Sequence, residues 1–336
     1  MPAETAARGK ARRVRGGSAS PRVQVSEMQR ARLLAAATVS IAELGYARAS
    51  VAHITARARV SRRTFYDLFE SREDCLLAVL GDTVDRIAQE LAGASLEGVS
   101  WCERVRTGLW IVLSFFDREP ELARLCVVDS ASGGPGVQEW RQDLIARLAA
   151  IVDEGRPRGA RAAARVPALT AEGSVGAVLA ILHTRLLNSE REPVSGLLGQ
   201  LMGMIVLPYM GASVALSECK RPAPKTPSPA AQARVYHANH DPLRDIPMRL
   251  TYRTARVLEA VAEHPGTSNR FIGEQADIYD QGQVSKLLAR LEGLGLLANT
   301  GAGHTHGERN AWSLTPLGER VTKQLTLTND THQETS

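Results

Sequence analysis

Apolar residues recur with a helical period at the start of the chain. Between Ser26 and Gly45 they form one stripe, and Ser26 is a residue type that caps helices while Gly45 is one that ends them. Two shorter apolar groups follow, and each is preceded by a serine that can cap a helix, Ser50 and Ser61. The residues predicted to face inward are Leu33, Leu34, Ala37, Ile41, Leu44, Val51, Ile54, Ala58, Phe65, Leu68 and Phe69. Three short helices, the last two joined by a tight turn, predict a helix-turn-helix over residues 26–77.

The next stretch repeats the helical period in longer segments. Helices are predicted at about 72–93, 99–117, 120–130, 137–153, 171–189 and 195–217. The predicted helices are separated at Gly93, Pro120, the GGPG run at 133–136, and Pro193. No segment alternates with the period of a strand, so residues 78–219 are predicted to form an all-helical domain.

From residue 220 the composition changes. Residues 220–247 hold a cluster of four prolines and no apolar face, which predicts an extended linker. Helical stripes return in residues 248–327, with Ser268 as a cap and Gly295 as an end, and a glycine-rich loop between two short apolar runs predicts a β-hairpin. This segment is predicted to be a winged helix, followed by a tail at 328–336. The predicted fold class is mainly α with one small β-hairpin.

The first 25 residues form a basic arm. Six arginines and lysines stand against Glu4 alone, and without an apolar face the segment is predicted to be disordered. It could be only a solubilising tail, or it could run along phosphates or enter a minor groove, and both interpretations stay open. No secretory signal is visible, an organelle transit peptide is the less favoured interpretation, and a cytoplasmic location is expected.

One uncharged segment, Val194–Ser217, is long enough to cross a bilayer. It contains four glycines together with Gln200 and Pro208, so a buried helix at a subunit interface is preferred and no membrane partner is expected. Gly199 and Gly203 lie four residues apart and would let two helices approach closely.

Composition narrows the functional classes. The chain has 41 lysines and arginines against 36 acidic residues, and its formal net charge of +5 permits a polyanionic partner. Its four cysteines are widely spaced, so neither disulfides nor a zinc site is predicted. His304 and His306 lack a third ligand nearby, and no metal is expected. No nucleophile elbow, phosphate-binding loop, dinucleotide fingerprint or HExxH helix occurs, which argues against an enzyme and against a cofactor.

The arginines concentrate where a helix-turn-helix would read DNA. In this motif one helix lies in the major groove, with its N-terminal residues at the base edges. Arg62 and Arg63 face outward there, and a bidentate arginine–guanine pair contributes about 1–3 kcal/mol of discrimination. A solvated helix face is the simpler interpretation of such a charge run, but here the opposite face of the helix is apolar.

Residues 28–77 resemble the DNA-binding domain of the TetR family of transcriptional regulators. The run ASVAHITARARVSRRTFYDLFESREDCL carries the resemblance through Ile54, Ala58, Val60, Ser61, Thr64, Phe65, Tyr66, Phe69, Ser71, Arg72 and Leu76. The predicted DNA-binding residues are Ser50, Ser61, Arg62, Arg63, Thr64, Tyr66, Asp67 and Arg72. By the resemblance Arg62, Arg63 and Asp67 lie near base edges. Arg59 occupies a turn position that is commonly glycine in the family, and a positive φ there would cost about 1 kcal/mol.

The same resemblance implies that residues 78–219 bind an effector and form a homodimer. The helices at about 171–189 and 195–217 would build a four-helix bundle with a partner subunit, and a dimer would bind a palindromic site. The candidate effector-binding residues are Trp110, Phe115, Arg124 and His183. The plainer interpretation of each is an ordinary core or surface residue, and the sequence does not identify the effector.

Residues 248–327 resemble winged helix-turn-helix domains of the MarR type. The runs SNRFIGEQADIYDQGQVSKLLARLEGLGLLANT and NAWSLTPLGERV carry this resemblance. The second set of DNA-binding candidates is Tyr279, Gln281, Gln283, Ser285, Lys286, Arg290 and Arg309, with His304 and His306 also in the wing. The alternative is a module that has kept the fold for protein contacts.

Together these features predict a dimeric, ligand-responsive, DNA-binding transcriptional regulator, and repression is the expectation that the family supplies. The alternative is a helical ligand-binding or scaffold protein whose helix-turn-helix domains serve protein contacts. Strongly salt-dependent DNA binding would separate the two, because phosphate contacts release counterions. A purely architectural DNA-binding protein is less favoured, since coating DNA does not require six further helices.

Overall fold

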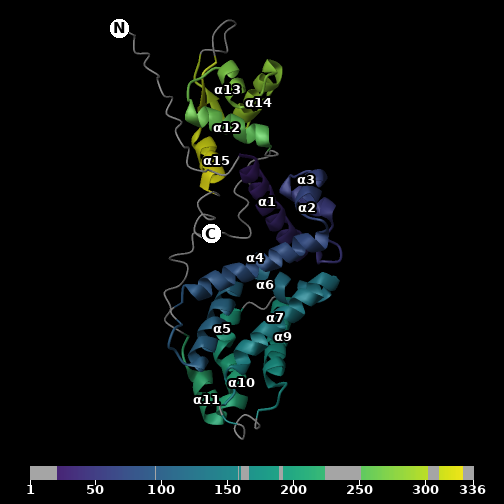
Figure 1. The fold of residues 1–336 in the computed structure, drawn as a ribbon, viewed down its shortest axis with the longest axis vertical. Coiled ribbons are helices and arrows are strands. Elements are labelled where there is room, and N and C mark those ends of the chain that lie inside the picture. Colours follow the sequence, from purple (N-terminus) through teal and green to yellow (C-terminus); the bar gives the residue numbers. More distant parts are fainter. Residues whose placement is uncertain are drawn as a thin grey trace, which may run out of the picture. The chain divides into compact units, whose positions relative to one another are not determined.

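The computed structural model of the 336-residue chain describes residues 21–94, 96–157, 159, 166–188, 192–223, 251–301 and 310–327. The chain divides into two compact units, one comprising Gln29–Arg249 and the other Leu250–Ser336 with Met1–Met28. Both units are mainly helical, as predicted, and the sheet found in the described ranges is one small hairpin near the end of the chain (Figure 1). Most of the predicted basic arm and of the predicted linker lies outside the described residues.

The first three helices are α1 (Pro21–Leu44), α2 (Val51–Ala58) and α3 (Arg62–Leu68). The prediction that Ser26 starts α1 is wrong, because the helix begins five residues earlier at a proline, a residue suited to the first helical position. α1 ends before Gly45, whose φ of 76° fits a helix-ending glycine. The fully buried core of this group includes Leu33, Ile41, Ile54, Ala58 and Phe65.

Longer helices complete the larger unit. They are α4 (Arg72–Ala92), α5 (Trp101–Arg118), α6 (Pro120–Val127), η1 (Asp129–Ser132), α7 (Pro135–Asp153), α9 (Thr170–Leu187), η2 (Val194–Leu197), α10 (Leu198–Met210) and α11 (Ala212–Lys220). Figure 1 shows α4 running between α1–α3 and the other helices of this unit. α4 is therefore the element that joins the helix-turn-helix to the all-helical domain.

The predicted single helix at 195–217 is two helices. Gly211, with φ 82°, ends α10, and α11 packs back against α10. A Cβ added to Gly199 would lie 2.5 Å from the carbonyl oxygen of Cys219, and a Cβ added to Gly203 would collide with Cys219 Sγ. The two glycines do let helices approach closely, but both helices belong to one chain. Apolar residues continue on both sides of Gly211, and the positive φ at Gly211 marks the break.

The smaller unit has the three predicted helices and the predicted hairpin, followed by a helix, α15, that was not predicted. It contains α12 (Tyr252–Glu263), α13 (Asn269–Gln275), α14 (Gln281–Gly293), β1 (Leu297–Asn299), β2 (Trp312–Leu314) and α15 (Pro316–Leu327). β1 and β2 pair antiparallel with Leu297 opposite Leu314, and Thr267 forms an isolated bridge with Trp312. The core of this unit includes Val257, Leu258, Ile272, Leu288 and Leu296. Its relation to the MarR type stays a prediction.

Candidate functional site

α2 begins with a reciprocal cap. The Ser50 hydroxyl accepts a hydrogen bond from the His53 amide at 3.3 Å, and the Ser50 amide donates to His53 Nδ1 at 3.3 Å. Ser50 therefore has the capping role that the sequence predicted. Because a hydroxyl can donate while it accepts, this cap leaves Ser50 able to contact a phosphate, which stays a prediction.

The turn between α2 and α3 passes through Arg59, whose φ is 53°. The neighbouring Val60 is buried and donates its amide to the carbonyl oxygen of Thr55 at 3.0 Å. A left-handed arginine costs about 1 kcal/mol relative to glycine, and the buried valine holds the turn in place against that cost. The turn thereby fixes the direction in which α3 leaves α2.

α3 buries one face and presents the other. Ser61 caps the helix by accepting from the Thr64 amide at 3.0 Å, and the two hydroxyl oxygens lie 2.8 Å apart. Phe65 is fully buried, while Tyr66 is 58% exposed with its ring edge-on to that of Phe65. The exposed residues of this helix are Arg62, Arg63, Tyr66 and Asp67. The structure thus brings the predicted hydroxyls and arginines together at one helix N-terminus, where a recognition helix approaches DNA.

Arg72 has a structural role that sequence reasoning missed. Its Nη1 donates to the carbonyl oxygens of Tyr46 at 2.9 Å and Ala49 at 2.5 Å, and its guanidinium lies 4.3 Å from the Tyr46 ring centroid. These partners are 26 and 23 residues earlier in the chain, so no local pattern indicates them. A phosphate contact by the rest of the guanidinium stays a prediction.

The smaller unit contains a second helix-turn-helix, α13–α14. Ser268 caps α13 by accepting from the Phe271 amide at 3.4 Å, and Asp277, with φ 54°, makes the turn. Asp280 caps α14 by accepting from the amides of Gly282 at 2.8 Å and Gln283 at 3.1 Å. The exposed residues at or near this helix include the predicted candidates Tyr279, Gln281, Gln283, Ser285, Lys286 and Arg290. Tyr279 is 85% exposed, and a DNA contact there stays a prediction.

Asn269 connects α14 to the hairpin. Its Nδ2 donates to Ser285 Oγ at 3.0 Å, and its Oδ1 accepts from Asn310 Nδ2 at 3.1 Å and Trp312 Nε1 at 2.6 Å. This network fixes α14 relative to β2, and sequence reasoning missed it because its members are distant along the chain. The predicted wing residues Arg309, His304 and His306 lie outside the described residues.

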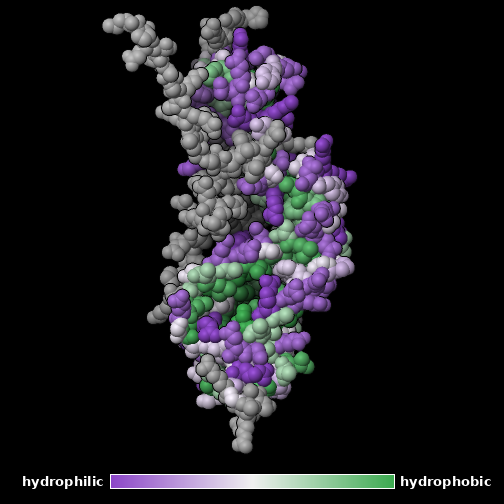
Figure 2. All heavy atoms as spheres, in the orientation of Figure 1, coloured by the Kyte–Doolittle hydropathy of each residue, from purple (hydrophilic) through white to green (hydrophobic). Residues whose placement is uncertain are grey.

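The four effector candidates do not share one environment. Phe115 is 1% exposed, and the guanidinium groups of Arg86 and Arg118 lie 5.1 and 5.8 Å from its ring centroid, so Phe115 belongs to the core. The half-buried candidates are Trp110, Arg124 and His183. Figure 2 shows hydrophobic side chains gathered below α4, where the surface of the larger unit is hollowed. A shared effector pocket stays a prediction.

A buried carboxylate lies beside Arg124. Arg124 Nε is 3.7 Å from Asp129 Oδ2, and within the described part of the chain neither atom has a hydrogen-bond partner. Burial raises the pKa of Asp129, and the Arg124 guanidinium counteracts the rise. Ser114 Oγ is also buried without a hydrogen-bond partner in these ranges. Such atoms can pair with the polar groups of a ligand, and sequence reasoning had not singled out Asp129 or Ser114.

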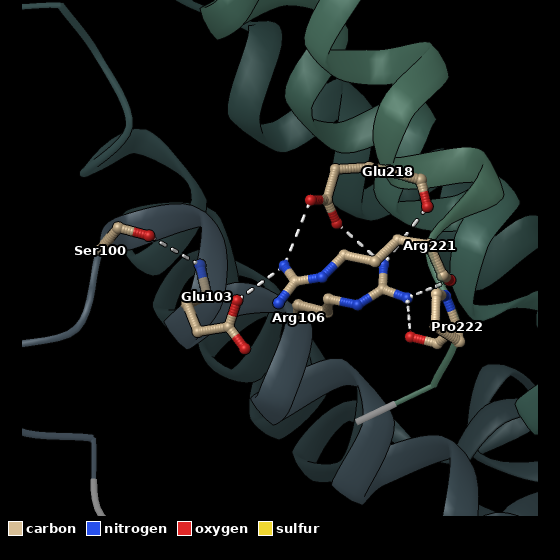
Figure 3. Close-up of polar contacts among 6 residues, drawn as sticks. All are labelled: Ser100, Glu103, Arg106, Glu218, Arg221 and Pro222. Carbon is tan, nitrogen blue, oxygen red and sulfur yellow. Dashed lines mark hydrogen bonds and ion pairs between the residues drawn. The ribbon is translucent and has the colours of Figure 1, made fainter. Parts of the chain in front are cut away.

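A second buried polar cluster joins α5 to the end of α11 (Figure 3). Arg106 is 1% exposed and donates to Glu218 Oε2 at 2.8 Å and to the carbonyl oxygens of Arg221 and Pro222 at 2.6 and 2.9 Å. Arg221 in turn lies 2.7 Å from Glu103 Oε2. A cation is favoured at a helix C-terminus, so this cluster fixes the end of α11. The sequence feature that could have indicated this cluster is Arg106, a charged residue on the apolar stripe of α5.

Other kinds of site receive no support from the described ranges. They contain no group of three or more histidine, cysteine, aspartate or glutamate side chains that could hold a metal. Burial raises the pKa of Cys75 and Cys126 to about 12, which keeps both thiols protonated. Among the helices described, none is both long and apolar enough to cross a membrane.

Residues 33–79 match the family model of the bacterial regulatory proteins, tetR family. The match spans the second half of α1, all of α2 and α3, and the first residues of α4, so it includes every exposed arginine of α3. Among curated proteins, none matches the chain.

Solved structures of regulators are similar to part of the chain. The fatty acid degradation regulator FadR from Bacillus halodurans is 17% identical, with a TM-score of 0.46, over 53% of this chain and 94% of that protein. FadR from Bacillus subtilis, solved in complex with stearoyl-CoA, is 18% identical, with a TM-score of 0.42, over 54% and 97%. A TetR-like transcriptional regulator from Rhodococcus sp. RHA1 is 23% identical, with a TM-score of 0.40, over 52% and 93%.

The matched family consists of transcriptional regulators and not of enzymes. Its helix-turn-helix coincides with the capped α2–α3 pair and its exposed arginines. Residues 33–79 are therefore similar to the N-terminal domain of the bacterial regulatory proteins of the tetR family.

Proposed function

We propose that the chain is a ligand-responsive repressor that binds a palindromic operator as a homodimer in the cytoplasm. The observation that carries this proposal is the face of α3, where Arg62 and Arg63 are exposed at the capped N-terminus of a helix-turn-helix. The family match of residues 33–79 supports DNA as the partner. Repression rather than activation is the family's expectation.

We propose that α9 and the α10–α11 pair form the dimer interface. The exposed face of α9 is uncharged over the small residues Gly173, Gly176, Ala180 and Thr184 and the larger Leu187. A Cβ added to either glycine would have nothing within 4 Å. The exposed large apolar residues of α10–α11 are Leu207, Met210 and Leu216. An interface core is depleted of charge, and this surface meets that requirement.

An effector is proposed to bind in the all-helical domain. The buried Asp129 and Arg124 offer polar atoms to pair with a ligand, and Trp110 and His183 are the further candidates. An effector can change operator affinity only through its differential affinity for two conformations of the dimer. The proposed response is a change in the separation of the two copies of α3.

The α14 face is the second DNA-binding candidate. Residues 250–327 hold eight basic and eight acidic residues, whereas residues 26–77 hold eight basic and six acidic residues. Because phosphate contacts dominate DNA affinity, the neutral unit is expected to contribute less than α3. A module for protein contacts is the alternative role for this unit.

Selection of binding sites from random duplex DNA with the full-length protein tests the proposal. The expected product is a palindrome whose half-sites are about one helical turn apart, and binding should weaken steeply with added salt. Sedimentation of the free protein should give the mass of a dimer. If no site is enriched at low salt, the regulator proposal fails, and the helical ligand-binding or scaffold alternative takes its place.

A further inference from the structure

α7 begins without a cap of its own. Gly134 occupies the N-cap position and has no side chain to offer. The missing bond comes from α4, where Glu73 Oε1 accepts from the Val137 amide at 3.2 Å. A carboxylate is also favoured near a helix N-terminus by the helix dipole. Glu73, a residue of the DNA-binding domain, therefore caps a helix of the all-helical domain.

The GGPG run makes room for this carboxylate. A Cβ added to Gly134 would lie 2.5 Å from Glu73 Oε2, and a Cβ added to Gly136 would lie 3.0 Å from Glu73 Oε1. Both distances are shorter than an ordinary van der Waals contact of about 3.5 Å. A side chain at Gly134 would accordingly push Glu73 away from Val137. The sequence predicted only a turn at the GGPG run. In the structure, the same run leaves space for the side chain of Glu73.

On the side of the DNA-binding domain, the first turn of α4 is fixed to the helix-turn-helix. Arg72, next to Glu73, holds the carbonyl oxygens of Tyr46 and Ala49. Ala49 directly precedes Ser50, which caps α2. A displacement of the first turn of α4 would therefore be transmitted to the segment from which α2 and α3 start.

On the other side, α7 is held to the region of the buried carboxylate. Gln138 Nε2 donates to the carbonyl oxygen of Ala131 at 2.9 Å, and Arg141 Nη1 donates to Ser130 Oγ at 3.0 Å. Both acceptors belong to η1, which begins at Asp129. Hydrogen bonds thus connect η1 to α7 and α7 to Glu73, and Arg72, the chain neighbour of Glu73, is bonded to the segment before α2.

We propose that Glu73 is the positioning residue that couples DNA binding to the first turn of α7. This inference rests on the proposed function. If operator binding tightens the Glu73–Val137 contact, an effector that loosens α7 lowers operator affinity. Coupling between two sites is reciprocal, so the operator then lowers effector affinity by the same factor. A cap with only a structural role would stabilise α7 equally with and without DNA, and this difference separates the two roles.

Hydrogen–deuterium exchange of the full-length chain tests the proposal, with and without the duplex selected from random DNA. In the wild type, the duplex should slow exchange of peptides covering residues 133–141 by about fivefold or more. Glu73→Ala should still bind the duplex and lose this slowing, and Glu73→Gln, which keeps an acceptor oxygen, should restore part of it. Gly134→Ala, which keeps Glu73 but displaces it, should behave like Glu73→Ala. Glu70→Ala removes an exposed acid three residues away and should respond like the wild type.

If the duplex slows exchange of residues 133–141 as much in both Glu73→Ala and Gly134→Ala as in the wild type, the proposal is overturned. A wild type that binds the duplex without any change in residues 133–141 would also overturn it, and would leave the proposed function intact. A wild type that binds no duplex would end both the proposed function and the coupling, so the two failures are distinguishable.

Discussion

The chain contains two helix-turn-helix segments whose second helices begin differently. α3 starts from a neutral cap, Ser61, followed by Arg62 and Arg63, whereas α14 starts from an acidic cap, Asp280, followed by Gln281. The two backbones share two features. Each turn contains one left-handed residue that is not glycine, Arg59 or Asp277, and a side chain caps each second helix.

The difference lies in electrostatics and not in fold. The amides at a helix N-terminus attract anions, and in α14 the Asp280 carboxylate already accepts from two of them. In α3 a serine supplies the cap, so no negative charge opposes an approaching phosphate at this position. Two similar backbones thus present different charges at the start of the second helix, and function depends on the residues placed on a fold.

The largest expected effect on DNA affinity comes from removing the exposed arginines of α3. Arg62→Ala combined with Arg63→Ala should reduce affinity for the selected duplex by about 1–3 kcal/mol for each side chain that contacts a base. Lys286→Ala with Arg290→Ala in α14 removes the same charge and should have a much smaller effect. Fluorescence anisotropy at fixed salt measures both, and equal losses from the two pairs would contradict the assignment of α3 as the main reader.

The next effect concerns how closely the paired helices approach. Gly273 and Thr55 hold matching positions in the two segments. The Gly273 carbonyl oxygen accepts from the amide of the buried Ile278, and the Thr55 carbonyl oxygen accepts from the amide of the buried Val60. A Cβ added to Gly273 would lie 2.9 Å from the Ile278 carbonyl oxygen, so Gly273→Ala should lower the free energy of unfolding by about 1–3 kcal/mol. Thr55→Ala loses one hydrogen bond to Val51 and should cost about 1 kcal/mol. Urea denaturation measures both, and an unchanged stability in Gly273→Ala would show that the second segment is loosely packed.

The two left-handed turn residues should differ in strain. Arg59→Gly should raise the free energy of unfolding by about 1 kcal/mol, because arginine gains nothing locally from a positive φ. Asp277→Gly should gain less, since aspartate tolerates this region better. Thermal denaturation of the free protein compares them without interference from DNA, and a larger gain at Asp277 would contradict the expected order.

The smallest effect exchanges the caps. Serine and aspartate cap helices about equally well, so Ser61→Asp and Asp280→Ser should leave both helices folded. Ser61→Asp should weaken binding of the selected duplex and Asp280→Ser should strengthen binding of random duplex at low salt, each by about 0.3–1 kcal/mol. Titrations at two salt concentrations measure these changes. If neither exchange alters binding, cap charge does not distinguish the two helices.

Local features of the fold were predictable because neighbouring residues encode them. The caps at Ser50 and Ser61 and the left-handed turn at Arg59 all depend on hydrogen bonds and sterics within a few residues. The break at Gly211 escaped prediction, since the apolar run continues on both sides of it.

Side-chain partners distant in sequence could not be predicted. Arg106 and Glu218 are 112 residues apart, and Glu73 and Val137 are 64 residues apart. Nothing in either local pattern indicates the other member, because tertiary packing alone brings them together. The candidate DNA-binding face of α3 was therefore named residue by residue, whereas the contacts that connect it to the rest of the molecule required the structure.

The most direct test of the central claim compares two exposed tyrosines, Tyr66 within α3 and Tyr279 just before the cap of α14. Each is replaced in turn by photoreactive p-benzoylphenylalanine in the full-length chain, and the complex with the selected duplex is irradiated. Cross-linking from position 66 to nucleotides inside the palindrome, with little from position 279, is the predicted result. Cross-linking from position 279 with none from position 66 would contradict the account.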